Sequence, residues 1–245
     1  MNKIAILYTT FLRDELMYKT IQSIVNNYTE NCILLIGDQN ATDAKENILS
    51  SIRANYYDLS YDCGLSYSRN YLVERARELN CEYCLLSADS LELNQSLSDL
   101  NVIIDFMNSD ENIGIVGLKI NNRVKWNWNI TLEKEFFDLT KATDIKNFKD
   151  LEFTKCQVVS NFFLARTQCL LENKWDNELK LLEHEDFFYR LSQTHWKVYA
   201  SEFYKCNYIN DKPNSYKIMR DRMYTEFKHK LQLKYNITGW IREER

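Results

Sequence analysis

Apolar runs alternate with helical patterns through the first half of the chain. Short apolar runs at residues 3–8, 32–37, 84–86 and 113–120 predict buried strands, and a more polar run at 55–60 predicts a weaker one. Between them, apolar residues recur at helical spacing. This spacing predicts helices at 14–26, 41–52, 66–79 and 97–107. The alternation predicts an α/β fold with a mostly parallel sheet and helices on both faces.

Two acids follow predicted strands in this half. Gly64 opens a turn into a helix, with Ser66 as its expected N-cap, and the strand after that helix ends at Asp89. Asp38 ends another predicted strand. Ligands of open α/β sheets bind outside the carboxyl ends of the strands. Asp38 and Asp89 are therefore candidates to contact a ligand, and Asp89 is a candidate metal ligand.

The pattern breaks in the second half. Residues 121–155 are polar, aromatic and without clear periodicity, and they contain Trp126 and Trp128. Aromatic rings complement the apolar C–H faces of sugars, so this segment is either an acceptor surface or a loop held on the core by its aromatic side chains. A strand is predicted at 156–166, with a helix after it at 167–172.

An acidic cluster precedes a short apolar helix predicted at 187–191. Acids at a helix N-terminus are stabilised by the helix macrodipole, which is the simplest structural explanation. Three acids around one histidine are more acidic residues than the stabilisation of a helix N-terminus needs, however. The cluster therefore indicates a catalytic or binding site. The cluster consists of Glu183, His184, Glu185 and Asp186. His184 is interpreted as a ligand or as a hydrogen-bonding partner that orients a neighbour.

The chain from residue 216 onward is basic and has apolar residues at a spacing of four. They predict an amphipathic helix, and they are Met219, Met223, Phe227 and Leu231. The helix has three alternative interpretations: a packing helix with a solvated basic face, a clamp for phosphate, or a patch for an anionic membrane surface.

Composition narrows the class of protein. The chain has 245 residues and a net charge of −4, which argues against a general nucleic-acid binder. Five glycines and one proline leave no visible linker, so a single domain is favoured. We find neither a secretory signal nor a run of about 20 apolar residues, and the seven scattered cysteines suit reduced thiols. These features predict a cytoplasmic protein.

Four motifs then occur in a fixed order. They read TFLR at 10–13, GLSYSRN at 64–70, NFFLAR at 161–166 and EHEDFF at 183–188. Together they resemble inverting glycosyltransferases of the GT-A type, in the family 2-like group that includes β-1,4-N-acetylgalactosaminyltransferases. The resemblance implies a Rossmann-like GT-A domain over residues 1–210, with a nucleotide-sugar half at 1–120 and an acceptor and catalytic half at 121–210. A helical extension would follow at 211–245.

The resemblance also implies roles for single residues. Asp186 would be the general base, with Glu185 holding the acceptor, because a sugar hydroxyl is a poor nucleophile until a carboxylate accepts its proton. Asp38 would contact the nucleoside, and Arg69, supported by Asn70, would lie near the donor. The predicted donor-binding residues are Thr10, Arg13, Asp38, Arg69, Asp89, Arg220 and Arg222. The predicted acceptor-binding residues are Trp126, Trp128, Asn161 and His184.

The expected metal site departs from the family pattern. Ser87-Ala88-Asp89 stands where the family has Asp-x-Asp, and Cys206-Asn207 stands where it has a histidine. Mn²⁺ and Mg²⁺ prefer hard oxygen or imidazole ligands, so a metal cofactor is doubtful. Either Asp89 holds the ion weakly with diphosphate oxygens and waters, or the enzyme is metal-independent. In the second case the diphosphate charge would be met by Arg220, Arg222 or Lys217.

The expected function is transfer of a sugar from a UDP-hexose or UDP-N-acetylhexosamine to a glycan or lipid-linked acceptor. Such an enzyme would serve surface polysaccharide or lipo-oligosaccharide synthesis, in the cytoplasm or peripherally at the inner membrane face. The alternative is a degenerate GT-A domain that binds carbohydrate or a partner without turnover. A nucleotidyltransferase is disfavoured, because residues 9–13 contain no glycine.

Overall fold

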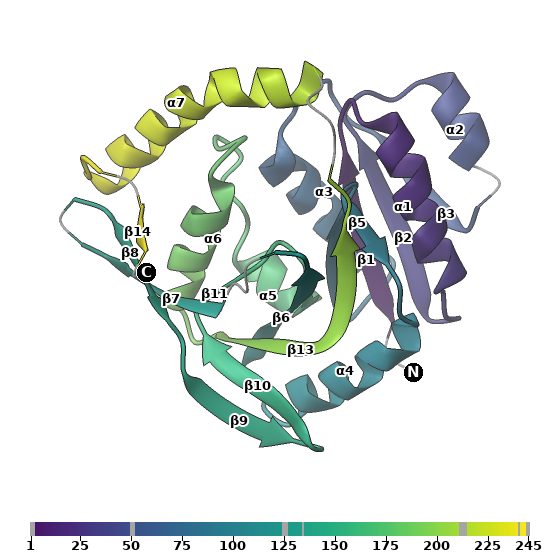
Figure 1. Cartoon of the computed structure of the whole chain (residues 1–245). Helices are drawn as coiled ribbons and strands as arrows, with labels where there is room; N and C mark the ends of the chain where they lie inside the picture. Colours follow the sequence, from purple (N-terminus) through teal and green to yellow (C-terminus); the bar gives the residue numbers. More distant parts are fainter. Residues whose placement is uncertain are drawn as a thin grey trace.

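A ten-stranded sheet forms the centre of the molecule. The computed structural model describes residues 3–49, 52–123, 127–133, 135–210, 215–239 and 241–243 (Figure 1). In spatial order the strands are β3 (Ala54–Asp58), β2 (Cys32–Asp38), β1 (Ile4–Thr10), β4 (Tyr83–Ala88), β12 (Phe163–Arg166), β6 (Ile113–Asn121), β13 (Lys197–Tyr208), β10 (Leu151–Cys156) and β9 (Asp144–Phe148), and β5 (Leu91–Leu93) pairs with β13. Of these, β12, β10 and β5 run against the others. The predicted α/β class with a mostly parallel sheet is confirmed.

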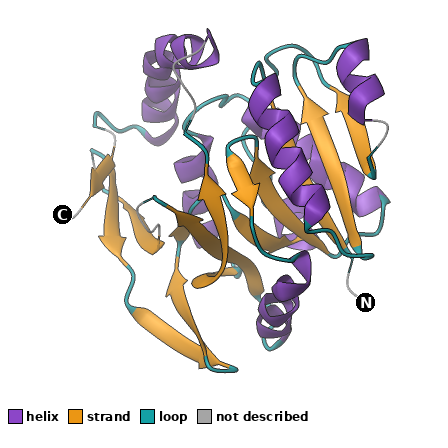
Figure 2. Cartoon of the chain, turned by 45° about the vertical axis from the view of Figure 1, so that its right-hand side comes forward, coloured by secondary structure: helices purple, strands orange, loops and turns teal. Residues whose placement is uncertain are grey.

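Helices cover both faces of this sheet (Figure 2). They are α1 (Asp14–Asn26), α2 (Asp43–Leu49), α3 (Leu65–Glu78), α4 (Leu100–Asn108), α5 (Thr167–Glu172), α6 (Glu183–Ser192) and α7 (Ser215–Tyr235), with a 3₁₀ turn η1 (Leu97–Asp99) before α4. Alternate residues of β1 feed two separate cores. Ala5 and Leu7 pack on the side of α3, α5, α6 and α7, whereas Ile4, Ile6 and Tyr8 pack on the side of α1, α2 and α4.

A smaller sheet lies beside the first and contains part of the segment expected to be irregular. Its strands, in spatial order, are β11 (Val158–Val159), β7 (Asn127–Leu132), β8 (Phe137–Lys141) and β14 (Ile241–Glu243). The expectation of an irregular 121–155 segment is therefore wrong, since β7 to β10 pair as antiparallel strands. One face of each such strand can meet water, so few apolar residues are needed and the sequence signal is weak. Lys149 and Asp150, both with positive φ, form the tight turn between β9 and β10.

The predicted basic tail forms α7, which arches over one side of the molecule from the region of α3 to that of β8 (Figure 1). Phe227 and Leu231 are buried in the core on the α3 and α6 side, and β14 then pairs in parallel with β8. The boundary expected at residue 210 falls between β13 and α7. No helix in the described ranges is both long and apolar enough to cross a membrane.

Two helix starts differ from the sequence prediction. Gly64, and not Ser66, is the N-cap of α3, because the Ser66 hydroxyl instead donates a hydrogen bond of 2.6 Å to the backbone carbonyl of Leu179. Helix α6 begins at Glu183, four residues before its predicted start. The acidic cluster therefore lies within the first turn of a helix, where successive side chains point in different directions.

Candidate active site

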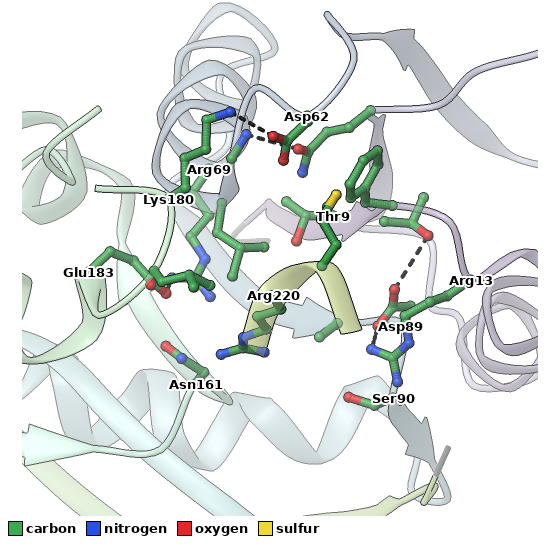
Figure 3. A pocket seen from close by; sticks show the side chains of 18 of the residues that line it. Thr9, Arg13, Asp62, Arg69, Asp89, Ser90, Asn161, Lys180, Glu183 and Arg220 are labelled. Carbon is green, nitrogen blue, oxygen red and sulfur yellow. Dashed lines mark hydrogen bonds and ion pairs between the residues drawn. The ribbon is translucent and has the colours of Figure 1, made fainter. Parts of the chain in front are cut away.

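A cavity of 190 Å³ lies beyond the carboxyl ends of β1 and β4 (Figure 3). Thr9, Thr10, Ala88 and Asp89 line it from the strand ends. The start of α3, the loop before α6 and the first half of α7 close its other sides, through Gly64, Leu65, Arg69, Lys180, Leu181, Met219, Arg220 and Met223. This is the edge at which open α/β sheets bind ligands. We call it the first cavity.

Gly64 shapes one wall of the first cavity. Its φ of +88° lies in the region that favours glycine, and a Cβ there would lie 2.7 Å from Cγ of Lys180. Its backbone N–H donates to Oε1 of Gln39 at 2.8 Å. The turn therefore needs glycine for both conformation and space, and it fixes the start of α3 against the loop after β2.

Three ion pairs tie distant segments together across the first cavity. Arg13 lies 2.6 Å from Asp89, Arg69 lies 2.8 Å from Glu183, and Lys180 lies 2.7 Å from Asp62 (Figure 3). Arg220 adds another cation, and no ion pair joins it to a residue within the described ranges. The lining thus holds four cationic side chains and three carboxylates, a net charge of +1. Such a lining suits an anionic ligand.

Asp89 stands where the sequence predicts it, at the end of β4. One carboxylate oxygen lies 2.6 Å from Arg13, and the other accepts a hydrogen bond of 3.4 Å from the Thr10 hydroxyl. In the described part of the chain, no three His, Cys, Asp or Glu side chains are grouped to hold a metal ion. A single carboxylate already paired with a guanidinium does not fit a tightly bound divalent ion.

A second cavity of 420 Å³ adjoins the first. Both are lined by Arg13, Ala88, Ser90, Asn161, Glu183 and Arg220, so these residues mark their boundary. The second cavity continues past the boundary, where its lining is Leu91, Ile120, Arg123, Ser160, Leu182, His184, Glu185 and Tyr208. One ligand in each cavity would therefore meet at the shared residues.

The first turn of α6 presents three of its four cluster residues to these cavities. Glu183, His184 and Glu185 line the second cavity, and each is at most 8% exposed. Successive helical residues are rotated by about 100°, so Asp186 points about 200° away from His184. The resemblance implies that Asp186 meets the acceptor, but Asp186 is fully buried and lines neither cavity.

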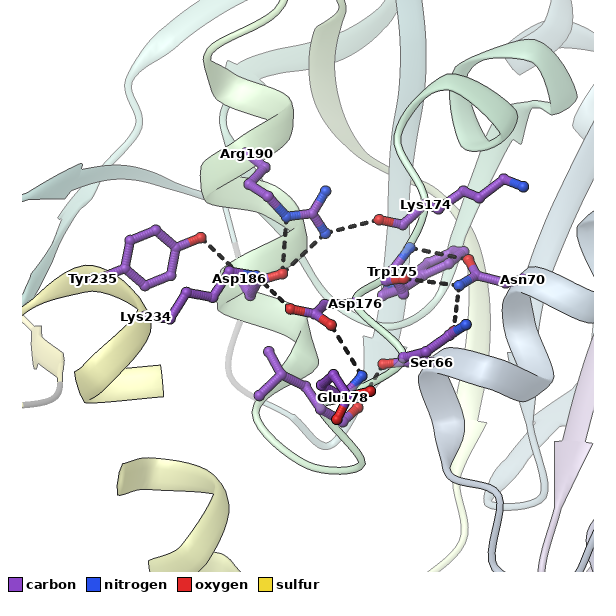
Figure 4. Close-up of polar contacts among 12 residues, drawn as sticks. Ser66, Asn70, Lys174, Trp175, Asp176, Glu178, Asp186, Arg190, Lys234 and Tyr235 are labelled. Atoms are coloured by element: carbon purple, nitrogen blue, oxygen red, sulfur yellow. Dashed lines mark hydrogen bonds and ion pairs between the residues drawn. The ribbon is translucent and has the colours of Figure 1, made fainter. Parts of the chain in front are cut away.

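Asp186 lies in a polar network that joins α6 to α7 (Figure 4). Its carboxylate is fully buried and accepts a hydrogen bond of 2.9 Å from Arg190 and one of 2.7 Å from the Tyr235 hydroxyl. Lys234 lies 2.6 Å from the same carboxylate and 2.6 Å from Asp176. Both carboxylate oxygens therefore have partners within the protein, and Asp186 anchors the C-terminal half of α7.

His184 is buried and hydrogen-bonded to Asn161, which lies on the boundary of the two cavities. The distance from Nδ1 of His184 to Oδ1 of Asn161 is 2.8 Å. Burial, and to a smaller extent the charge of Arg69, lower the pKa of His184 to about 3, whereas a hydrogen bond to the backbone of Val159 opposes the shift. The imidazole is therefore neutral at pH 7 and hydrogen-bonded to Asn161, and its role as a ligand or as an orienting partner stays a prediction.

The buried imidazole predicts a pH-dependent stability. Between pH 6.5 and about 3 the unfolded chain binds a proton at His184 that the folded chain does not, so the free energy of unfolding is expected to fall as the pH drops below 6.5. Urea unfolding at pH 7.5, 6.5 and 5.5 measures this. His184→Gln should flatten the dependence, and the exposed His195→Gln should keep it. Equal slopes in the wild type and His184→Gln would contradict the prediction.

Arg69 lines the first cavity, and Asn70 supports it indirectly. The side-chain amide of Asn70 donates to the backbone carbonyl of Trp175 at 2.8 Å. Its oxygen accepts a hydrogen bond of 3.0 Å from the backbone N–H of Trp175 (Figure 4). The Arg69 guanidinium lies 5.4 Å from the centre of the Trp175 ring. Asn70 thus positions the aromatic ring of Trp175, with which the Arg69 guanidinium makes a cation–π contact.

Besides Asp186, four predicted site residues lie away from both cavities or outside the described structure. Asp38 is fully buried beneath the strand ends, where Lys45 lies 3.0 Å and the Tyr56 hydroxyl 2.9 Å from its carboxylate. Arg222 is exposed on α7, about 200° around the helix from Arg220. Trp128 is half-buried against the core from β7, and Trp126 lies outside the described residues.

Several residues that line the cavities were not predicted from the sequence. Gln39 follows directly after Asp38, and Arg123 and Tyr208 lie at the carboxyl ends of β6 and β13. The strand-end rule could have found these three if it had been applied to every strand. Asp62 and Lys180 come from loops, where no periodicity points to a partner.

No protein-family model matches the sequence. The structure is similar to that of S. aureus TarS 1-349, with a TM-score of 0.60 at 13% identity over 92% of this chain and 70% of that chain. It is also similar to S. aureus TarS 1-349 in complex with UDP-GlcNAc, with a TM-score of 0.61 at 14% identity over 86% of this chain and 60% of that one. The complex of TarS 1-349 with UDP gives a TM-score of 0.58 at 14% identity over 94% and 72% of the two chains.

The chain has a GT-A fold. This confirms the fold implied by the four motifs. The comparisons do not support the narrower resemblance to β-1,4-N-acetylgalactosaminyltransferases.

Proposed function

We propose that this GT-A chain is an inverting glycosyltransferase that moves a sugar from a nucleotide-sugar, a UDP-hexose or UDP-N-acetylhexosamine, to a glycan or lipid-linked acceptor. One observation carries the proposal. Two cavities meet at the carboxyl edge of the sheet, with cations on the first and an additional carboxylate, Glu185, on the second. The similar TarS structures with UDP and UDP-GlcNAc support a uridine nucleotide as donor.

The donor would occupy the first cavity. A diphosphate is anionic, and the lining has a net charge of +1 even after Asp62, Asp89 and Glu183 are counted. Arg220 and Arg13 lie on the boundary between the cavities, so they are placed to meet the diphosphate next to the bond that breaks. Fixed positive charges there stabilise the leaving group as its negative charge grows.

The acceptor would occupy the second cavity, with Glu185 as the general base in place of Asp186. The acceptor oxygen forms a bond to the anomeric carbon while the bond to the diphosphate oxygen breaks and its electron pair leaves with UDP. The hydroxyl proton passes to Glu185, since a carboxylate within reach of the hydroxyl makes it nucleophilic. Attack opposite the leaving group inverts the anomeric configuration.

UDP binding is expected to persist in EDTA and to depend on Arg220. Charge-assisted hydrogen bonds are worth about 1.5–3 kcal/mol, so Arg220→Ala should weaken UDP binding about 10- to 100-fold in calorimetry. Arg222→Ala, on the opposite side of the same helix, is the matched control and should bind UDP like the wild type. A requirement for Mn²⁺ would instead assign the diphosphate charge to a metal at Asp89. Absence of UDP binding in both Mn²⁺ and EDTA would contradict the glycosyltransferase proposal and favour a degenerate module.

The role in surface polysaccharide or lipo-oligosaccharide synthesis in the cytoplasm stays a prediction. Peripheral membrane association through α7 also stays a prediction. The structure turns Arg220 toward the cavities and pairs Lys234 with Asp176 and Asp186. These two cations are therefore used inside the molecule, and fewer charges of the helix remain for a membrane surface.

A further inference from the structure

We infer that the acceptor carries an anionic group, a carboxylate or a phosphate, and that Arg123 binds it. This inference rests on the proposed function and adds the chemical class of the acceptor. Arg123 and Tyr208 line the far wall of the second cavity, which the first cavity does not reach. None of the transfer steps described above uses either residue.

Paired strands hold these two side chains together. Arg123 follows the end of β6, Tyr208 ends β13, and the two strands run in parallel with Asn121 opposite Asn207. The side chains of Asn121 and Asn207 are hydrogen-bonded at 3.0 Å. On its other side β13 pairs with β5, where Tyr208 lies opposite Leu91, another lining residue. Tyr208 therefore lies on the sheet, and Arg123 lies in the turn two residues beyond the end of β6.

The Arg123 guanidinium lies 3.7 Å from the centre of the Tyr208 ring. At this distance the ring covers one face of the guanidinium, while the N–H donors at its edge stay available. Donors arranged in this planar fork match the two oxygens of a carboxylate or phosphate. Because the ring limits the motion of the guanidinium, less side-chain entropy is lost when an anion binds.

Charge and shape of the second cavity agree with such a ligand. Its lining contains Arg13, Arg123 and Arg220 against Glu183 and Glu185, a net charge of +1, with His184 neutral. A UDP diphosphate in the first cavity would engage Arg13 and Arg220 at the boundary. Arg123 then remains as the cation of the lining that UDP does not engage, and the apolar lining residues Leu91, Ile120 and Leu182 suit the C–H face of a sugar ring.

Three sugars that differ only at C6 test the inference. The full chain, saturated with UDP so that the diphosphate site is filled, is titrated with glucose, glucuronate and glucose 6-phosphate by NMR. At least one anionic sugar is expected to bind about 10-fold or more tightly than glucose, as charge-assisted hydrogen bonds imply. Preference for glucuronate would assign a carboxylate acceptor, and preference for glucose 6-phosphate a phosphate acceptor.

Two variants separate Arg123 from general surface charge. Arg123→Ala should remove the preference for the anionic sugar and leave the affinity for UDP unchanged. Lys119→Ala removes a half-exposed cation from β6, the strand that precedes Arg123, and should keep the preference; Lys119 is paired with Glu202 at 2.7 Å. Equal binding of the three sugars, or a preference that survives in Arg123→Ala, would overturn the inference while UDP binding upholds the proposed function. A chain that does not bind UDP would overturn both.

Discussion

Glu185→Gln is expected to lower the rate of sugar transfer by about 10²- to 10⁴-fold while the affinity for UDP stays unchanged. Glutamine has nearly the same size and still accepts hydrogen bonds, but it cannot take a proton from the acceptor hydroxyl. Glu185 lines the second cavity and is absent from the lining of the first, so the change should affect the acceptor step and not donor binding. A UDP-release assay with saturating donor, together with UDP calorimetry, measures both quantities.

Two further variants serve as controls: one removes an exposed carboxylate outside the cavities, and the other removes the alternative general base. Glu178→Gln removes an exposed acid from the loop before α6 and should leave the transfer rate unchanged. Asp186→Asn tests the base implied by the sequence motif. If Asp186→Asn abolished transfer in a protein of normal stability, and Glu185→Gln did not, the assignment of Glu185 would be wrong and Asp186 would have to reach the acceptor in another conformation.

Asp186→Ala is expected to reduce the free energy of unfolding by about 2–4 kcal/mol. Removing one partner of a buried ion pair typically costs about 3–5 kcal/mol, because the remaining charge is left without compensation. Here Arg190 and Lys234 are each about a third exposed, with side-chain values of 32% and 31%, so water solvates them in part and the expected loss is smaller. Urea unfolding monitored by far-UV circular dichroism measures the difference.

The hydrogen bond between Asp186 and Tyr235 provides control variants for the stability change in Asp186→Ala. Tyr235→Phe removes a single hydrogen bond and should cost about 1 kcal/mol. The double variant should cost less than the sum of the two, since both changes break the same 2.7 Å contact. Limited proteolysis should also cut α7 faster in Asp186→Ala. A loss below about 0.5 kcal/mol with unchanged proteolysis would show that Asp186 does not hold α7 in place.

The sequence by itself identified the elements with strong periodicity. The strands at β1, β2, β4 and β6 and the helices between them follow from apolar runs, because buried parallel strands need continuous apolar residues and their crossovers need amphipathic helices. The rule that ligands bind at strand ends then placed Asp89 on the first cavity. The antiparallel strands β7 to β10 escaped the prediction, because few of their apolar residues are buried, such as Ile130 and Phe153, and β9 buries none.

Only the tertiary structure decided which side chains share a cavity. The motif EHEDFF identifies a polar helix start, but the rotation of about 100° per residue sends Glu185 toward the second cavity and Asp186 toward α7. Arg220 and Arg222 look equivalent in the sequence, and the packing of Phe227 and Leu231 determines that Arg220 faces the cavities. Arg123 and Tyr208 are 85 positions apart in the sequence. The parallel pairing of β6 with β13 brings the Arg123 guanidinium to 3.7 Å from the centre of the Tyr208 ring. Local patterns determine elements, whereas the directions of side chains depend on how those elements pack.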